Sequence, residues 1–252
     1  MIFYFINYMI HLVTFATGHC IKGQKKMVQS AIEQGIHPDN IHTFGHDDVF
    51  EDPFVKENMH IFKERKGVGY WAWKPLLILK VMKQISMGDV IVYHDSGRPC
   101  YDFMKFTDPL EPFVEHVCQY FQGVGTVFGP FKHRVWTKKD CFDVMGCTDQ
   151  RYLTQNQASA TWGIWQKSTL SITILTEWLR WMMHESRIVT DDKSILGEEA
   201  HDFKHHRHDQ SILTNILLRL HFQGKYKKLM RSQGVYEKNI NKIGKRVIER
   251  QK

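Results

Sequence analysis

The segment best suited to chemistry reads YHDSGR, residues 93–98, and continues an apolar run over Val90–Tyr93. Such a run predicts a central strand covered on both faces. In open α/β sheets, ligands bind outside the carboxyl ends of the strands, where Asp95 would lie. The Ser96-Gly97 pair after it lets the backbone turn tightly. Hard divalent cations that bridge a diphosphate prefer oxygen ligands, so Asp95 is a candidate metal ligand; capping a turn is the structural alternative.

A second candidate segment lies upstream and reads KGVGYWAWKP, residues 66–75. Its glycines allow close backbone approach, and Tyr70 and Trp73 could frame a sugar or a base. Lys74 stands at the start of a predicted helix, where the helix dipole disfavours a cation. A bound phosphate would relieve that conflict, since helix N-termini and lysine both attract anions. In the alternative, the aromatic pair packs in the core.

A third cluster reads HHRHDQS, residues 205–211, and opens another predicted helix. Three histidines in four residues are typical of a transition-metal site. Adjacent histidines point in different directions, however, and no second group of ligands lies at zinc spacing. We therefore favour a loop that delivers one side chain, His208 or Asp209, into the crevice.

These segments need a scaffold, and the first half of the chain predicts one of alternating strands and helices. Apolar periodicity and Gly/Pro boundaries place strands over residues 10–17, 40–44, 90–93 and 124–128, and helices over residues 25–34, 75–87 and 112–121. The first strand closes at Thr17-Gly18, a further candidate binding loop. This rhythm predicts an α/β fold with a mainly parallel, Rossmann-like sheet and helices on both faces.

The second half is less regular. It predicts a strand over 158–165 and helices over 170–184 and 209–220, with a polar loop over 190–208. Asp209 or the residue before it is the expected N-cap of the last helix. We expect one domain, residues 9–224, followed by a basic helical tail, residues 225–252.

Composition is that of an ordinary globular protein, with 42% hydrophobic and 24% charged residues in 252. The net charge of +7 resides in the tail, because residues 225–252 hold ten Lys/Arg and two Glu. Such a tail could contact an anionic membrane, nucleic acid or an acidic partner, or form a solvated helix face. One rival function is therefore nucleic-acid or anionic-surface binding, and another is a metal-dependent phosphoesterase built on Asp95 and the histidines.

The five cysteines include no CxxC pair, which indicates a reducing, cytoplasmic compartment with a peripheral membrane contact through the tail as an option. Met1–Ile10 is apolar but lacks the basic region and cleavage site of a signal peptide. It is too short to span a bilayer and leads into the first strand. Met9 would serve equally well as a start, so we expect residues 1–8 to be dispensable.

Four segments now combine: GVGYWAWKP, GDVIVYHDSGR, NQASATWGIW and FKHHRHDQSIL, in this order within residues 10–220. Together they resemble a glycosyltransferase-like family known from bacteria, algae and large DNA viruses. The resemblance implies a GT-A fold, one nucleotide-sugar-binding domain with Mn²⁺ or Mg²⁺ at an Asp-x-Asp-type motif. Asp95 matches the first Asp of that motif. Gly97 stands where the second Asp is common, which removes one carboxylate from the metal site.

The resemblance also implies roles for individual residues. Asp209-Gln210 is similar to the Asp-Gln-x-x-Leu stretch of glycogenin-like retaining transferases, which places both beside the transferred sugar as catalytic residues. Trp162 and Trp165 lie where an acceptor could stack, with packing in the core of a strand as the alternative. The implied metal ligands are Asp95 and His208. The implied donor contacts are Thr17, Gly18, Tyr70, Trp73, Lys74, Asp95, Ser96, Gly97 and Arg98.

The expected function is transfer of a sugar from a nucleotide-diphosphate donor to a glycan, protein or lipid acceptor. A metal would act as a Lewis acid on the leaving diphosphate, with Lys74 or Arg98 adding electrostatic support. The Asp-Gln string favours retention of configuration. In an inverting enzyme Asp209 would instead be the general base for the acceptor hydroxyl.

Overall fold

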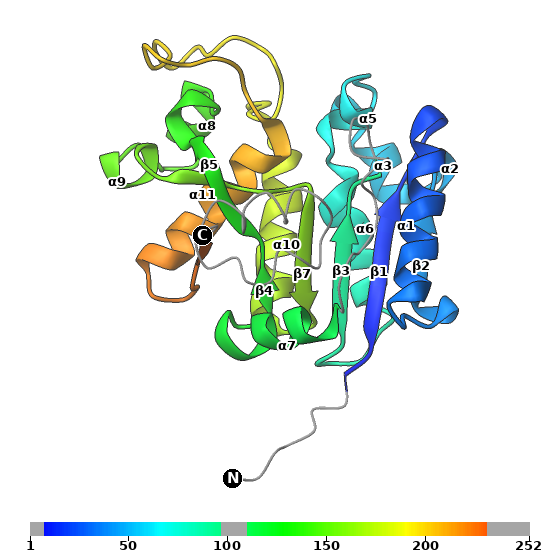
Figure 1. Cartoon of the computed structure of the whole chain (residues 1–252). Coiled ribbons are helices and arrows are strands. Elements are labelled where there is room, and N and C mark those ends of the chain that lie inside the picture. Colours follow the sequence, from blue (N-terminus) through cyan, green and yellow to red (C-terminus); the bar gives the residue numbers. More distant parts are fainter. Residues whose placement is uncertain (1–7, 97–109, 231–252) are drawn as a thin grey trace.

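A five-stranded sheet forms the centre of the protein, in the order β2-β1-β3-β7-β4 (Figure 1). The structure is a computed structural model that describes residues 8–96 and 110–230. The strands of this sheet are β1 (Ile10–Phe15), β2 (Ile41–Phe44), β3 (Val90–His94), β4 (Val124–Gly125) and β7 (Trp162–Gln166). β1 is parallel to β2 and β3, whereas β7 is antiparallel to β3 and β4. The α/β class is confirmed, and the sheet is mixed, because β7 runs antiparallel to both of its neighbours, β3 and β4.

Helices cover both faces of this sheet because its strands alternate their apolar side chains between the two sides. One face packs on α1 (Ile21–Glu33) and α7 (Glu111–Tyr120) through residues such as Leu12 and Val92. The other face packs on α6 (Trp73–Met82), α10 (Thr169–Met182) and α11 (His208–Phe222). α6 carries the Lys74 side chain and α11 carries Asp209, so this second face supplies the site.

Two predicted strands are each divided in the structure. The expected strand over 124–128 becomes β4 and β5 (Val127–Lys132), and the one over 158–165 becomes β6 (Asn156–Ala158) and β7. Between the two breaks, the Thr126 hydroxyl donates to the Ser159 carbonyl. β5 and β6 leave the central sheet and form a second one with β8 (Leu229–Met230), in the order β6-β5-β8.

Several helix ends differ from the sequence prediction. α6 begins at Trp73 and ends at Met82, and α1 begins at Ile21. Asp209 does not cap α11: Arg207 is the N-cap residue, and no side chain caps that end. The short helices and turns are Gly18–Cys20, Pro38–Asn40, α2 (His46–Phe50), α3 (Pro53–Glu57), α4 (Met59–Phe62), α5 (Gly67–Tyr70), His133–Val135, α8 (Lys139–Val144) and α9 (Gln150–Leu153).

The folded part of the chain continues beyond residue 224. Tyr226 and Leu229 are buried, and β8 pairs with β5 in parallel. The rest of the predicted tail, residues 231–252, lies outside the described residues, as do residues 1–7. Within the described ranges, no helix has the length and apolar character needed to cross a membrane. The four cysteines described, Cys20, Cys118, Cys141 and Cys147, are free thiols.

Candidate functional site

Asp95 lies at the carboxyl edge of the sheet, as predicted. It follows β3, and its N–H donates to the Thr161 carbonyl at 2.8 Å, next to the first residue of β7. The backbone of Asp95 is therefore held between two central strands. β1 and β2 end at the same edge because they are parallel to β3, which brings Thr17 and Gly18 to this side of the molecule.

Lys74 connects Asp95 to Asp209. Its Nζ lies 3.2 Å from both carboxylate oxygens of Asp95 and 3.0 Å from Asp209 Oδ2, and it donates to the Ala160 carbonyl at 3.0 Å. The Asp209 contact is an ion pair without hydrogen-bond geometry. Only 3% of Lys74 is exposed, so this ammonium is desolvated and depends on its partners. We call these three residues the Asp-Lys-Asp cluster.

Tyr93 completes the environment of Asp95, and sequence reasoning did not assign it a role. Its hydroxyl donates to Asp95 Oδ1, and its ring lies 5.9 Å from Lys74 Nζ. The strand pattern offered a signal for this contact. Side chains two positions apart on an extended chain share a face, so Tyr93 and Asp95 point the same way.

The charges of the cluster do not balance. Two carboxylates and one ammonium leave a net charge of −1 when all three are ionised. Burial raises the pKa of Asp209 to about 6; the Asp95 carboxylate adds to the rise, and Lys74 opposes it. Burial disfavours the Lys74 ammonium, yet Asp209 and Asp95 together raise the pKa of Lys74. Lys74 therefore stays charged near neutral pH, and Asp209 is the group that can gain or lose a proton there.

Three rings, those of Tyr70, Trp71 and His208, form a wall beside the cluster; the Trp71 ring lies 5.9 Å from Lys74 Nζ. Tyr70 stacks on His208 with ring centroids 5.0 Å apart, and Trp71 lies 5.4 Å from the same ring. His208 Nε2 lies 2.9 Å from Asp191 Oδ1, and Lys66 Nζ lies 2.7 Å from Asp191 Oδ2. Burial lowers the pKa of His208 to about 4 despite Asp191, so the ring is neutral and donates through Nε2.

An unusual backbone turn places Tyr70 and Trp71 in this wall. Five consecutive residues, 67–71, have positive φ, which makes a short left-handed helical turn. Gly67 and Gly69 adopt this conformation readily, but Val68 at φ 54° does so at a steric cost of about 1–2 kcal/mol. The Trp73 indole N–H stabilises the turn by donating to the Gly67 carbonyl at 2.9 Å. The two glycines of the sequence motif thus serve the turn.

Gln210, the second predicted catalytic residue, is held at a different place. Its Nε2 donates to Gln157 Oε1 at 2.8 Å. The amide of Gln157, which is 1% exposed, donates in turn to the Trp136 carbonyl and to the Thr137 and Ser211 hydroxyls. Gln210 is therefore anchored to a buried polar network, and Asp209 alone of the pair contacts Lys74.

Three of the predicted contact residues are buried. Trp73 is 4% exposed and packs on Phe15 with centroids 4.0 Å apart; its ring lies 5.8 Å from Lys74 Nζ, and the ring of Trp71 lies 5.9 Å from the same atom. Trp165 is 2% exposed and packs on Trp178, which leaves no face for an acceptor. The Ser96 hydroxyl is buried and bonds to Thr14 Oγ1 at 2.6 Å, so it cannot reach a donor.

Of the remaining predicted contact residues, some are partly or fully exposed, and others lie outside the described residues. Trp162 is partly exposed at the start of β7 and packs on Phe113 with tilted rings, 5.7 Å between centroids. Gly18 is exposed at φ 50° in the turn after β1, next to the partly exposed Thr17. Gly97 and Arg98 lie outside the described residues, and the roles given to them stay predictions.

The three clustered histidines do not converge. His205 is exposed and packs edgewise on Trp136, with centroids 4.6 Å apart. His206 is buried, and its Nδ1 accepts the Lys138 backbone N–H at 3.2 Å. His208 has its own carboxylate partner. The expectation that the loop delivers a single side chain, His208 or Asp209, into the crevice stays a prediction.

The predicted metal ligands, Asp95 and His208, are engaged elsewhere. Both Asp95 oxygens face Lys74 Nζ, and His208 Nε2 faces Asp191. Across residues 8–96 and 110–230, no group of three His, Cys, Asp or Glu side chains could hold a metal ion. The cation beside Asp95 in this structure is the Lys74 ammonium, and metal binding by Asp95 and His208 stays a prediction.

Fold and site together define an α/β protein with a buried Asp-Lys-Asp cluster at the carboxyl edge of its sheet. In comparisons with protein-family models, with curated proteins and with solved structures, none matches this chain. A functional conclusion therefore rests on the geometry of the site and on the sequence motifs.

Proposed function

We propose that the chain is a glycosyltransferase that transfers a sugar from a nucleotide-diphosphate donor at the Asp-Lys-Asp cluster. The observation that carries the proposal is the position of Lys74 Nζ, 3.2 Å from Asp95 and 3.0 Å from Asp209, at the carboxyl edge. Ligands of open α/β sheets bind at that edge. The motifs that resemble a glycosyltransferase-like family contribute all three residues.

The charge of the cluster suits the reaction. Sugar transfer breaks the bond between the anomeric carbon and the diphosphate oxygen, which leaves with the electron pair. Positive charge develops on the anomeric carbon, and a fixed environment of net negative charge stabilises it. Carboxylates also accept hydrogen bonds from sugar hydroxyls, and such charge-assisted bonds are strong. In this proposal the sugar ring contacts Asp95 and Asp209, while Lys74 keeps the two carboxylates together.

Asp209 is the proposed proton acceptor. As the acceptor oxygen bonds to the anomeric carbon, its proton passes to the Asp209 carboxylate. A base works best when its pKa lies near the operating pH, and the pKa of Asp209 is raised to about 6. A base of this kind supports inversion, whereas the Asp-Gln string favours retention. The anomeric configuration of the product, measured by NMR, decides between them.

The first experiment is a thermal-shift screen of UDP-, GDP-, ADP- and CMP-sugars on wild type, Asp95→Asn and Asp209→Asn. We expect one nucleotide class to stabilise the wild type. With that donor, Asp209→Asn should lower kcat by about 10²- to 10⁴-fold, the usual contribution of a general base, with little change in donor affinity. Asp47→Asn, at an exposed carboxylate on α2, is the matched control.

The outcomes separate the proposal from its rivals. Full turnover in both Asp95→Asn and Asp209→Asn would contradict a role for the cluster, and no response to any donor would contradict the transferase assignment. Metal dependence stays a prediction, so the screen is run with Mn²⁺ and with EDTA. Stabilisation that survives EDTA would show that the donor binds without a divalent cation.

A further inference from the structure

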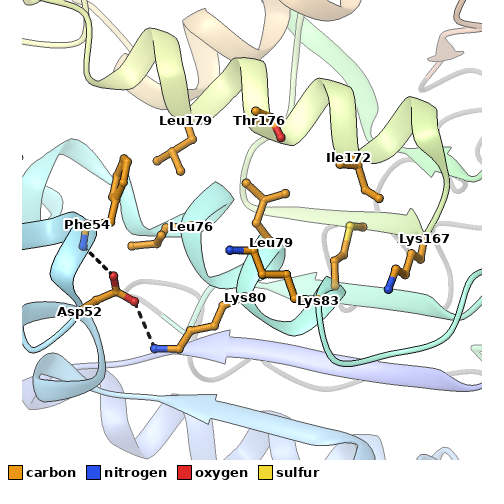
Figure 2. A pocket seen from close by; sticks show the side chains of 11 residues that line it. Asp52, Phe54, Leu76, Leu79, Lys80, Lys83, Lys167, Ile172, Thr176 and Leu179 are labelled. Carbon is orange, nitrogen blue, oxygen red and sulfur yellow. Dashed lines mark hydrogen bonds and ion pairs between the residues drawn. The ribbon is translucent and has the colours of Figure 1, made fainter.

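We propose that a groove between α6 and α10 binds a long-chain carboxylate, an anionic amphiphile with one hydrocarbon chain. The groove has a volume of about 550 Å³ (Figure 2). We call it the α6–α10 groove; its lining comprises Asp52, Phe54, Leu76, Leu79, Lys80, Met82, Lys83, Lys167, Ile172, Thr176 and Leu179. The proposal does not depend on the proposed function, because none of these residues belongs to the Asp-Lys-Asp cluster.

The floor of the groove is apolar because two helices turn hydrophobic residues toward each other. Leu76 and Leu79 come from successive turns of α6, and Ile172 and Leu179 come from α10. Leu79 and Ile172 are only partly buried, so hydrophobic surface stays open to solvent. Most ligand sites are concave, of 300–1,000 Å³, and mainly apolar, with a few polar groups that fix orientation. The α6–α10 groove matches this description.

The polar groups at the rim are predominantly cationic. Three lysines line the groove, against one carboxylate, Asp52. Lys80 Nζ pairs with Asp52 Oδ2 at 3.3 Å. Within the described residues, neither Lys83 nor Lys167 lies within ion-pair distance of a carboxylate; Lys167 donates to the Ile85 carbonyl at 2.7 Å. In the described part of the chain, two ammonium groups without a counter-charge therefore border an apolar floor.

The charges are unevenly distributed along the groove, which suggests an orientation for the ligand. In Figure 2, Lys167 and Ile172 lie at one end, and Phe54 lies at the other, beside the Asp52–Lys80 pair. Lys83 lies between these two ends in the same view. A carboxylate would face Lys167, with Lys83 beside the first part of the hydrocarbon chain, which would extend over the leucines toward Phe54. A polyanion such as nucleic acid would gain nothing from the apolar floor, so we assign a carboxylate with one chain.

Calorimetric titration of the full chain tests the proposal, with decanoate, laurate and myristate below their micelle-forming concentrations. We expect one molecule per chain and an affinity that rises about tenfold for every two methylene groups buried. 1-Dodecanol is the uncharged partner of laurate. Laurate should bind at least about threefold more tightly, because exposed ion pairs contribute modestly. Lys83→Gln/Lys167→Gln should abolish this preference while keeping the chain-length dependence.

Two further variants complete the test. Leu79→Asp, which places a charge on the floor, should abolish binding of laurate and 1-dodecanol alike, with thermal melting as the check on folding. Lys22→Gln, at an exposed position on α1, should bind like wild type. Absent laurate binding, binding unchanged in Leu79→Asp, or equal affinity for the alcohol would each overturn the proposal. A dimer that Leu79→Asp dissociates would also overturn it, since a second copy would then cover the groove.

Discussion

Lys74 Nζ lies 3.0 Å from Asp209 Oδ2, and this ion pair joins the first turn of α6 to the first turn of α11. Both residues are buried, with 3% of Lys74 and 5% of Asp209 exposed. The same ammonium faces Asp95 after β3. One side chain thus ties two helices to the central sheet and keeps two carboxylates close together, which makes stability and the proposed chemistry depend on the same contact.

Lys74→Met tests whether Lys74 stabilises the fold by pairing with Asp95 and Asp209. Methionine fills a similar volume but leaves two buried carboxylates without their cation. Breaking a buried ion pair in this way usually destabilises a protein by about 3–5 kcal/mol, and urea unfolding at pH 7.5 should show such a loss. The loss should shrink at pH 5, where Asp209 is protonated. Lys63→Met, at an exposed position, is the control; equal midpoints for both variants would contradict the prediction.

The pKa of Asp209 predicts a pH dependence of stability that its amide variant lacks. The pKa rises from an ordinary 3.8 to about 6 on folding, so the unfolded chain releases this proton first as pH increases. Ionisation therefore favours the unfolded state between about pH 4 and pH 6, by up to about 3 kcal/mol. Relative to Asp209→Asn, wild type should lose unfolding free energy across that window. Parallel curves for the two proteins would refute the pKa shift.

A buried histidine should change the free energy of unfolding with pH in the opposite direction, so that stability rises as pH increases. Burial lowers the pKa of His133 from 6.5 to about 4, so the unfolded chain binds this proton at higher pH than the folded chain does. Its contribution to stability is present above pH 6.5 and is lost as pH falls toward 4. His133→Gln should therefore flatten the pH profile of urea unfolding over that range. His19→Gln, at an exposed position, is the matched control variant.

Sequence patterns located Asp95 but could not reveal its partners. A continuous apolar run ending in a carboxylate predicts a strand end in an α/β sheet, and the structure has Asp95 there. The Lys74–Asp209 contact depends on how α6 and α11 each pack against α10, and local periodicity carries no information about that. For the same reason, the reversed direction of β7 was missed, because an apolar run reads alike in either orientation.

The different surroundings of Trp71 and Trp73 also required the structure. Both flank Ala72 in one motif, and alternation alone cannot say which ring packs on which neighbour. The left-handed turn over residues 67–71 places Trp71 beside His208, whereas Trp73 packs on Phe15. The glycines signalled backbone freedom, but positive φ at Val68 has no sequence signal, because β-branched residues disfavour that conformation.

The left-handed turn itself can be tested with two glycines of matched conformation. Gly69 in the turn and Gly35 after α1 have φ of 83° and 86°, so alanine is strained equally at both. A Cβ at Gly69 would lie 2.8 Å from Phe62 Cα, whereas one at Gly35 would meet nothing within 4 Å. Overpacking of this kind adds about 1–3 kcal/mol. Urea unfolding should show Gly69→Ala destabilised beyond Gly35→Ala by that amount, and equal losses would mean that the turn is not packed against α4 as described.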